Sequence, residues 1–217
     1  MNTYRILIAD DHEVVRRGIR SLLESRSGWE ICGEAKDGRE AVDLSKELKP
    51  DLVLLDIGMP NLNGLDAARQ IIAFRPLTRV LVLTIHDSDQ VVRDVLAAGA
   101  RGFLLKSDAG RDLLTAVEAM QRHRTFFTSQ VAEIVLDGYL NTRRVAPVTP
   151  RHKLTPRERE VVQLLAEGKT SKEVAVALDL SVKTAETHRT NIMRKLDLHS
   201  VADLTLYAVR NGIIQVF

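Results

Sequence analysis

Polar residues stand directly after four of the apolar segments in the first half of the chain. Asp10 and Asp11 follow the first segment, Asp56 the third, Thr84 ends the fourth and Lys106 follows the fifth. Because the carboxyl ends of parallel strands meet at one edge of a sheet, we expect these side chains to gather there. Clustered carboxylates repel one another and need a cation, and sites made of oxygen ligands suit Mg²⁺.

An aspartate in such a site can act as a nucleophile toward phosphorus. The Lys106 ammonium would neutralise an added phosphoryl group, and the Thr84 hydroxyl would donate a hydrogen bond to it. The plainer alternative for each single Asp is that it caps the following helix. That alternative accounts poorly for five coincident placements, so the pattern indicates an aspartate that accepts a phosphoryl group.

The elements that must position these residues are five apolar segments, each followed by apolar residues at helical spacing. Continuously apolar strands are buried on both faces, which is typical of a parallel sheet with helices on both sides. The predicted strands are Ile6–Ala9, Ile31–Gly33, Leu52–Leu55, Val80–Leu83 and Gly102–Leu105.

Residues 51–66 read DLVLLDIGMPNLNGLD and closely resemble the phosphoacceptor segment of response-regulator receiver domains. The acid pair after the first strand, the threonine after the fourth and the sequence FLLK at 103–106 match as well. The resemblance covers about residues 3–122. It implies an α/β fold, a flavodoxin-like, doubly wound, five-stranded parallel sheet.

This resemblance also assigns roles to single residues. It implies that Asp56 is the phosphoacceptor. Asp11, Asp56 and the backbone carbonyl of Gly58 would bind Mg²⁺, and Asp10 would complete the metal site by orienting metal-bound water. The remaining matched residues are Thr84 and Phe103, at the switch positions, and Lys106, the phosphate-pairing lysine.

Several neighbouring residues have plainer interpretations. Phe103 lies in an apolar strand, where by itself it is a core residue. Gly64 follows Asn63, which predicts a turn. We expect His86 and Asp87, which follow the fourth strand, to lie in a surface loop.

After Thr125 the pattern becomes helical and contains a break. Ser129 is expected to cap a helix over 130–140, and the two prolines that follow indicate a linker. Thr155-Pro156-Arg157-Glu158 places a cap, an N1 proline and an N3 glutamate in sequence, which predicts a helix start. Three more helices are predicted, over 172–178, from a Ser181 cap to about 196, and over about 201–210.

The third of these four helices carries a polar stripe. At 100° per residue, Lys183, Thr187, Thr190 and Arg194 fall within about 60° of one another. The apolar residues Ala185, Ile192 and Leu196 cluster on the opposite side. An ordinary solvated helix face would show the same stripe, so the stripe alone leaves both interpretations open.

Residues 154–200 read LTPREREVVQLLAEGKTSKEVAVALDLSVKTAETHRTNIMRKLDLHS and strongly resemble the LuxR-type domain of the NarL/FixJ family. The resemblance implies an all-α four-helix domain with a helix-turn-helix that binds double-stranded DNA. It implies dimer contacts through the last helix, 201–210. The residues that would contact DNA are Glu186, Thr187 and Thr190 at bases, and Lys172, Lys183 and Arg194 at phosphates.

The charge distribution agrees with two modules. Residues 1–120 hold 16 Lys and Arg against 19 Asp and Glu, whereas residues 151–217 hold 11 against 8.

No apolar run approaches the roughly 18 residues of a membrane span, no secretory signal is indicated, and Cys32 is the only cysteine. We therefore expect a cytoplasmic protein that does not associate with membranes. The expected domains are a receiver over 1–122, a linker helix and linker over 123–151, and a DNA-binding domain over 152–217.

Taken together, these patterns predict a transcription regulator rather than an enzyme. A sensor histidine kinase would phosphorylate Asp56, and the chain would then bind its operator as a homodimer. An aspartyl-phosphate phosphatase is a second hypothesis, but such enzymes carry a second Asp two residues after the nucleophile, where this chain has Gly58. A LuxR regulator gated by a small molecule is a third, and the acidic cluster argues against it.

Overall fold

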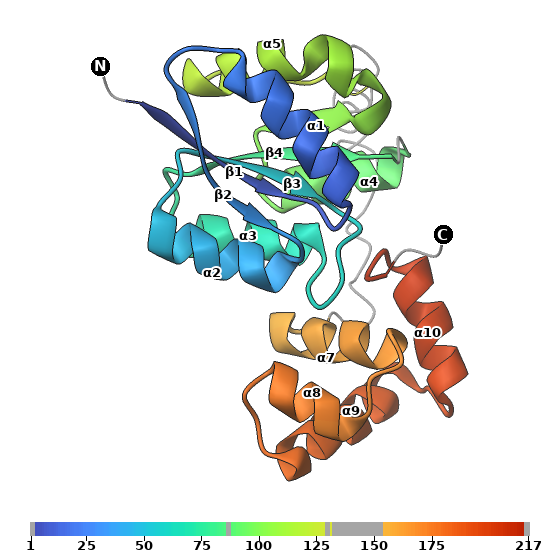
Figure 1. The fold of residues 1–217 in the computed structure, drawn as a ribbon. Coiled ribbons are helices and arrows are strands. Elements are labelled where there is room, and N and C mark those ends of the chain that lie inside the picture. Colours follow the sequence, from blue (N-terminus) through green and yellow to red (C-terminus); the bar gives the residue numbers. More distant parts are fainter. Residues whose placement is uncertain (1–2, 86–87, 129–130, 132–153, 215–217) are drawn as a thin grey trace. The chain divides into compact units, whose positions relative to one another are not determined.

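The computed structural model describes residues 3–85, 88–128, 131 and 154–214 (Figure 1). The helix and linker predicted between Ser129 and residue 153 fall largely outside the described residues, as do His86 and Asp87. The first half forms a five-stranded parallel sheet, as predicted, and the order of its strands is β2-β1-β3-β4-β5. Its strands are β1 (Tyr4–Ala9), β2 (Trp29–Ala35), β3 (Leu52–Asp56), β4 (Arg79–Thr84) and β5 (Gly102–Leu105).

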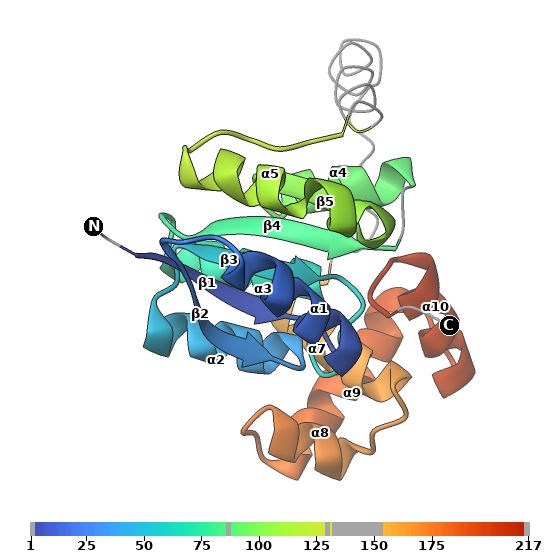
Figure 2. The ribbon, with the colours of Figure 1, turned by 45° about the horizontal axis from the view of Figure 1, so that its top comes forward.

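Helices cover both faces of this sheet (Figure 2), with α1 and α5 on one face and α2 and α3 on the other. Strand β2 extends two residues beyond the predicted segment at each end. None of the helices in the described part of the chain is long and apolar enough to cross a membrane. The helices are α1 (Glu13–Glu24), α2 (Gly38–Leu48), α3 (Gly64–Phe74), α4 (Asp89–Ala97) and α5 (Ala109–Gln121), with a 3₁₀ turn, η1 (Lys106–Asp108).

Alternation along the strands divides the core of the sheet between its two faces. Ile6 and Ile8 of β1 pack with Leu52 and Leu54 of β3 against α1 and α5. Leu7 and the other intervening residues are equally buried and point to the opposite face. Burial of both faces explains why the strands are continuously apolar, and it leaves the carboxyl edge of the sheet as the place for polar side chains.

The second half forms four helices around a core of its own. Thr155 caps the first helix in a reciprocal capping box with Glu158, and Ser181 caps the third, as predicted. The chain leaves the first and last helices through Gly168 and Gly212, both at positive φ. These helices are α7 (Pro156–Ala166), α8 (Ser171–Ala177), α9 (Val182–Leu196) and α10 (Val201–Arg210).

Gly64 does not act as the predicted turn residue; it is the first residue of α3. A Cβ atom at this position would lie 1.8 Å from the backbone oxygen of Asp56. The Gly64 N–H also donates to the Ile57 carbonyl at 2.9 Å. The glycine therefore allows the start of α3 to approach the backbone that carries Asp56.

This close approach generates a first prediction. Gly64→Ala should destabilise the sheet domain by about 2–3 kcal/mol, because the added methyl meets backbone atoms that cannot rotate away. The measurement is urea unfolding followed by the fluorescence of Trp29, the only tryptophan, which lies in β2. Gly18→Ala is the matched control: a Cβ there meets nothing within 4 Å, so it should stabilise α1 by about 0.5–1 kcal/mol. Equal midpoints for both variants would contradict the close approach.

Candidate functional site

The acidic residues predicted to meet at the carboxyl edge of the sheet do so. Asp10 follows β1 and Asp56 ends β3, and both side chains are almost fully buried, with relative exposures of 1% and 6%. Asp10, Asp11, His12 and Asp56 each offer a ligand atom, and these atoms all lie within 4.8 Å of one another. His12 was not predicted as part of this cluster, although its place directly after the acid pair was a usable signal.

Lys106 lies between the two buried carboxylates. Its Nζ is 2.7 Å from Asp56 Oδ2 and also 2.7 Å from Asp10 Oδ2. The strand pairing of β1 with β3 and of β4 with β5 brings these residues to one edge, although Lys106 and Asp56 are 50 positions apart. One ammonium group thus faces two carboxylates, and Asp11 adds a third.

The pKa values reflect this crowding. Burial raises the pKa of Asp56, and the adjacent Lys106 ammonium offsets this only in part. Burial by itself would lower the pKa of Lys106, but the carboxylates of Asp56 and Asp10 outweigh it and raise that pKa. A cation placed beside this carboxylate would favour its charged form and so oppose the effect of burial.

The oxygen donors of the cluster fit Mg²⁺, because this ion prefers carboxylate ligands and retains several waters. Backbone groups hold the two buried aspartates in place: the N–H of His12 donates to Asp10 Oδ1 at 2.9 Å, and that of Ile57 donates to Asp56 Oδ1 at 2.8 Å. Gly58, whose carbonyl was predicted as a further ligand, is half-buried two residues after Asp56. The donors present are therefore consistent with the predicted metal site.

The two predicted switch residues lie on neighbouring strands. Thr84 ends β4, is 1% exposed and pairs with Leu105, the residue before Lys106. Phe103 is buried in β5 opposite Val82, as its apolar context indicated. Thr84 thus stands at the same edge as the acidic cluster, and Phe103 lies inside the sheet.

In the helical domain, α9 presents the predicted polar face. Lys183, Thr187, Thr190 and Arg194 are all exposed, as are Glu186 on the same helix and Lys172 on α8. The Thr187 hydroxyl donates to the Lys183 carbonyl at 2.8 Å, which leaves its oxygen free to accept a hydrogen bond. The opposite side is apolar, with Ala185 and Ile192 buried and Leu196 partly buried.

Helix α9 is tied to the start of α7 by an ion pair that was not predicted. Lys195 Nζ lies 2.7 Å from Glu158 Oε2, and Glu158 also accepts from the Thr155 N–H at 2.7 Å. Burial acts to raise the pKa of Glu158, but Lys195 and the Thr155 N–H together lower it. Glu158 therefore both caps α7 and fixes the position of α9.

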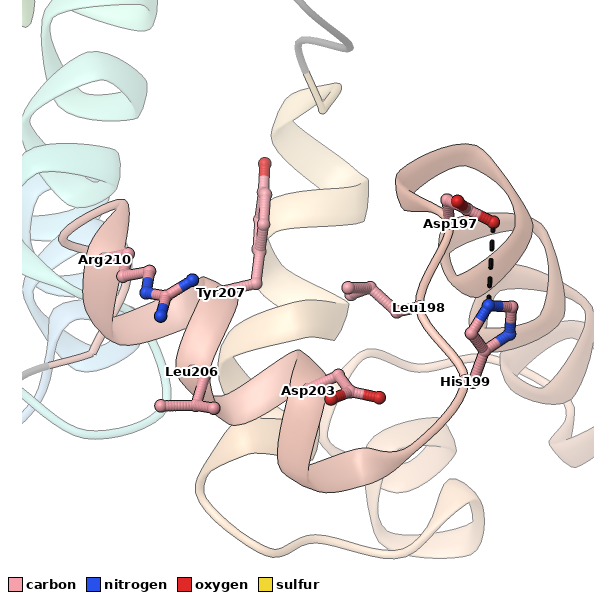
Figure 3. Close-up of a pocket in the computed structure, with 7 residues that line it drawn as sticks. All are labelled: Asp197, Leu198, His199, Asp203, Leu206, Tyr207 and Arg210. Carbon is pink, nitrogen blue, oxygen red and sulfur yellow. Dashed lines mark ion pairs between the residues drawn. The ribbon is translucent and has the colours of Figure 1, made fainter.

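The last helix exposes apolar side chains, among them Leu206, which Figure 3 shows. Val201, Leu206 and Val209 of α10 are 44%, 53% and 36% exposed. Beside them is a shallow hollow of about 320 Å³. It is lined by Asp197, Leu198, His199, Asp203, Leu206, Tyr207 and Arg210.

Comparison with known proteins identifies both halves. Residues 6–118 match the family described as "Response regulator receiver domain", and residues 152–208 match "Bacterial regulatory proteins, luxR family". The transcriptional regulatory protein LiaR of Bacillus subtilis is 38% identical over 210 residues, which cover 97% of this chain and 99% of LiaR. The oxygen regulatory protein NreC of Staphylococcus haemolyticus is 36% identical, with coverages of 97% and 99%.

A solved structure extends the similarity to a DNA complex. RcsB from Salmonella enterica serovar Typhimurium was determined bound to the promoter rprA in the presence of the phosphomimetic BeF₃⁻. It aligns with 95% of this chain and 98% of its own, with a TM-score of 0.57 and 27% identity.

The raised pKa of Asp56 generates a prediction about stability. A folded-state pKa above the unfolded value means that stability is fully present below the unfolded pKa of about 3.9 and is lost as the pH rises through the folded pKa. Asp56→Asn removes this loss, so in magnesium-free buffer it should raise the urea midpoint at pH 7. The gain should shrink as the pH is lowered toward about 4.

The control for this prediction is Asp43→Asn, because the Asp43 side chain is 63% exposed and lies outside the first turn of α2. It should leave the midpoint unchanged at both pH values. A lower midpoint for Asp56→Asn at pH 7 would mean that the ion pair with Lys106 outweighs the cost of burying the carboxylate.

Proposed function

The chain belongs to the two-component response regulators that carry a LuxR-type DNA-binding domain, and on this basis we propose that phosphorylation of Asp56 controls its binding to DNA. The observation that carries the proposal is the cluster of Asp10, Asp11 and Asp56 around Lys106. We propose a receiver domain over 1–122 and a DNA-binding domain over 152–217, joined by 123–151. The separate cores of the sheet and of the four helices support this division.

In the proposed reaction, an Asp56 carboxylate oxygen attacks the phosphorus of a phosphohistidine on a sensor kinase. The new O–P bond forms as the P–N bond breaks, and the histidine nitrogen leaves with the electron pair and takes up a proton. Lys106, 2.7 Å from Asp56, then faces the phosphoryl oxygens in place of the lost carboxylate charge. The Thr84 hydroxyl, at the same edge, would donate to one of those oxygens.

We propose that Asp11, Asp56 and the Gly58 carbonyl hold Mg²⁺, with Asp10 orienting its water ligands. Bound there, the ion would supply positive charge for the phosphoryl oxygens. The proposal is supported by the cluster of carboxylate oxygens. It also accounts for a third carboxylate, that of Asp11, in the same cluster as the two that Lys106 contacts.

For DNA binding, we propose that α9 enters the major groove. Its exposed face offers an acid and two hydroxyls to base edges, at Glu186, Thr187 and Thr190. The proposed phosphate contacts are cationic and exposed, and they are Lys172, Lys183 and Arg194. The helix-turn-helix order α8–α9 and the similarity to RcsB bound to a promoter support this arrangement.

We propose that the active form is a homodimer joined through α10, whose exposed Val201, Leu206 and Val209 offer an apolar contact surface. Moving an equilibrium from 1:99 to 99:1 needs about 5.5 kcal/mol of differential interaction. The phosphoryl group can supply part of this through Lys106 and Thr84, and dimer contacts can supply the rest. We further propose that a sensor histidine kinase is the phosphoryl donor, that the dimer binds a double-stranded DNA operator, and that the protein acts in the cytoplasm.

A phosphatase activity is the weaker proposal. The position two residues after Asp56, where such enzymes carry their second Asp, holds Gly58, which has no side chain for proton transfer. We therefore propose regulation, not enzymatic turnover, as the use of this site.

The central prediction concerns the phosphoryl mimic beryllofluoride with Mg²⁺. It should raise both the dimer content and the operator affinity of the full chain. Both should rise because the mimic shifts the protein toward the one conformation that dimerises and binds DNA. Sedimentation velocity and operator titration measure the two effects. Neither should change in Asp56→Asn, and intact mass should show one phosphoryl group added by phosphoramidate to the wild type and none to this variant.

An exposed aspartate provides the control for this test. Asp43→Asn on α2, with a side chain 63% exposed, should behave like the wild type. A phosphoryl group gained by Asp56→Asn would refute the choice of acceptor. Unchanged association and affinity in the wild type would leave a DNA-binding protein that phosphorylation does not control.

A further prediction concerns α9. Lys183→Ala should weaken binding to every DNA sequence and lower the salt slope by about one phosphate contact. Glu186→Ala with Thr187→Ala should instead change which sequences are selected from a random pool. Lys46→Ala, an exposed lysine on α2, is the control for lost charge. Unaltered sequence selection by the double variant would mean that α9 does not read bases.

A further inference from the structure

Arg16 is a largely buried cation beside the acidic cluster that no step of the proposed reaction uses. Its side chain is 15% exposed, whereas that of its neighbour Arg17 on α1 is 76% exposed. Arg16 Nη1 donates to the backbone carbonyl of Asp10 at 2.7 Å, and its Nε donates to Glu34 Oε2 at 3.2 Å. One guanidinium thus connects the end of β2 with the acid pair that follows β1.

These contacts complete a set of hydrogen bonds that hold Asp10. Its N–H donates to the Ala35 carbonyl at 3.1 Å, and its Oδ1 accepts from the His12 N–H at 2.9 Å. The Asp10 carbonyl, held by Arg16, belongs to the peptide plane that joins Asp10 to Asp11. The contact from Arg16 therefore restricts the orientation of this peptide plane, and with it the position from which the Asp11 side chain extends.

The orientation of Arg16 is itself determined by Glu34. Glu34 lies at the carboxyl end of β2, paired in register with Ile8, and its other oxygen accepts from Arg20 Nε at 2.6 Å. Burial would raise the pKa of Glu34, but Arg20 and Arg16 together lower it, so the carboxylate is charged at neutral pH. A charged acceptor on a strand gives the guanidinium a rigid support.

Arginine is suited to this place because its donors form a planar fork that points in two directions at once. Lysine would retain the charge, but a single ammonium on a flexible stem has no preset geometry for a carbonyl and a carboxylate. A partly buried ion pair also contributes little to net stability, because desolvation offsets much of the attraction. The geometry therefore indicates a role in positioning.

We propose that Arg16, oriented by Glu34, is a positioning residue that holds the Asp10–Asp11 peptide so that Asp11 can bind a divalent cation. This inference rests on the proposed function of the acidic cluster. It assigns no catalytic contact to Arg16. Groups that orient metal ligands typically change metal affinity by about 10- to 100-fold when they are replaced.

The test is Mg²⁺ titration of the full chain, followed by the amide resonances of residues at the carboxyl edge of the sheet. Arg16→Lys should weaken Mg²⁺ binding roughly tenfold, with a urea midpoint, read from Trp29, close to that of the wild type. Arg17→Lys, one position along α1, should leave both unchanged. Glu34→Gln should weaken binding by a smaller factor, and less than additively when combined with Arg16→Lys.

The outcomes separate this inference from the proposed function. Wild-type Mg²⁺ affinity in both Arg16→Lys and Glu34→Gln would overturn the positioning role while leaving the site intact. The positioning role would also be overturned if each variant lost Mg²⁺ affinity only to the extent that its urea midpoint fell. That result is what a purely structural role of Arg16 predicts. If the wild type and Asp11→Ala bind Mg²⁺ equally, the proposed cation site itself fails.

Discussion

The placement of Lys106 between the Asp10 and Asp56 carboxylates is the interaction on which the acidic site of the receiver domain depends. Two buried carboxylates near one another are unfavourable, and a single ammonium compensates them only in part, as the raised pKa of Asp56 shows. Such a site persists because the surrounding sheet is apolar on both faces and stabilises the fold independently of its edge. In the proposed reaction, the negative charge of this cluster favours a cation, and Lys106 faces the phosphoryl group once it has been added.

The supports of the site come from several elements. The backbone of Ile57 holds one oxygen of Asp56, and Gly64 lets α3 begin against the Asp56 carbonyl. On the other side of the cluster, Arg16 and Glu34 hold the backbone of Asp10. Asp10 and Asp56 are thereby fixed through their main chains as well as their side chains. A site held in this way needs little rearrangement when it binds a ligand, so more of the interaction energy is retained.

The helical domain uses a different physical arrangement. The polar face of α9 is exposed, and helix periodicity determines which residues lie on it. The position of α9 depends on its apolar side and on the ion pair between Lys195 and Glu158. The receiver site senses charge in a buried environment, where electrostatic interactions are strong. The polar face of α9 lies in solvent, and in the proposed DNA complex many weak contacts would add up there, each of them screened by salt.

Much of this was determined by the sequence alone. The five strands, the capping of α7 and α9 and the exposed stripe on α9 depend on residues within a few positions of one another, so periodicity and local hydrogen bonding were enough to predict them. Parallel topology also predicted that Asp10, Asp56 and Thr84 share one edge. Only the tertiary structure showed that Lys106 contacts both buried aspartates and that Arg16 joins Asp10 to Glu34. It also showed that Lys195 pairs with Glu158. Gly64 proved to be required by a close approach of two backbone segments and not by a turn. These contacts join segments between 6 and 96 positions apart. Their geometry depends on how strands and helices pack, which no short stretch of sequence encodes.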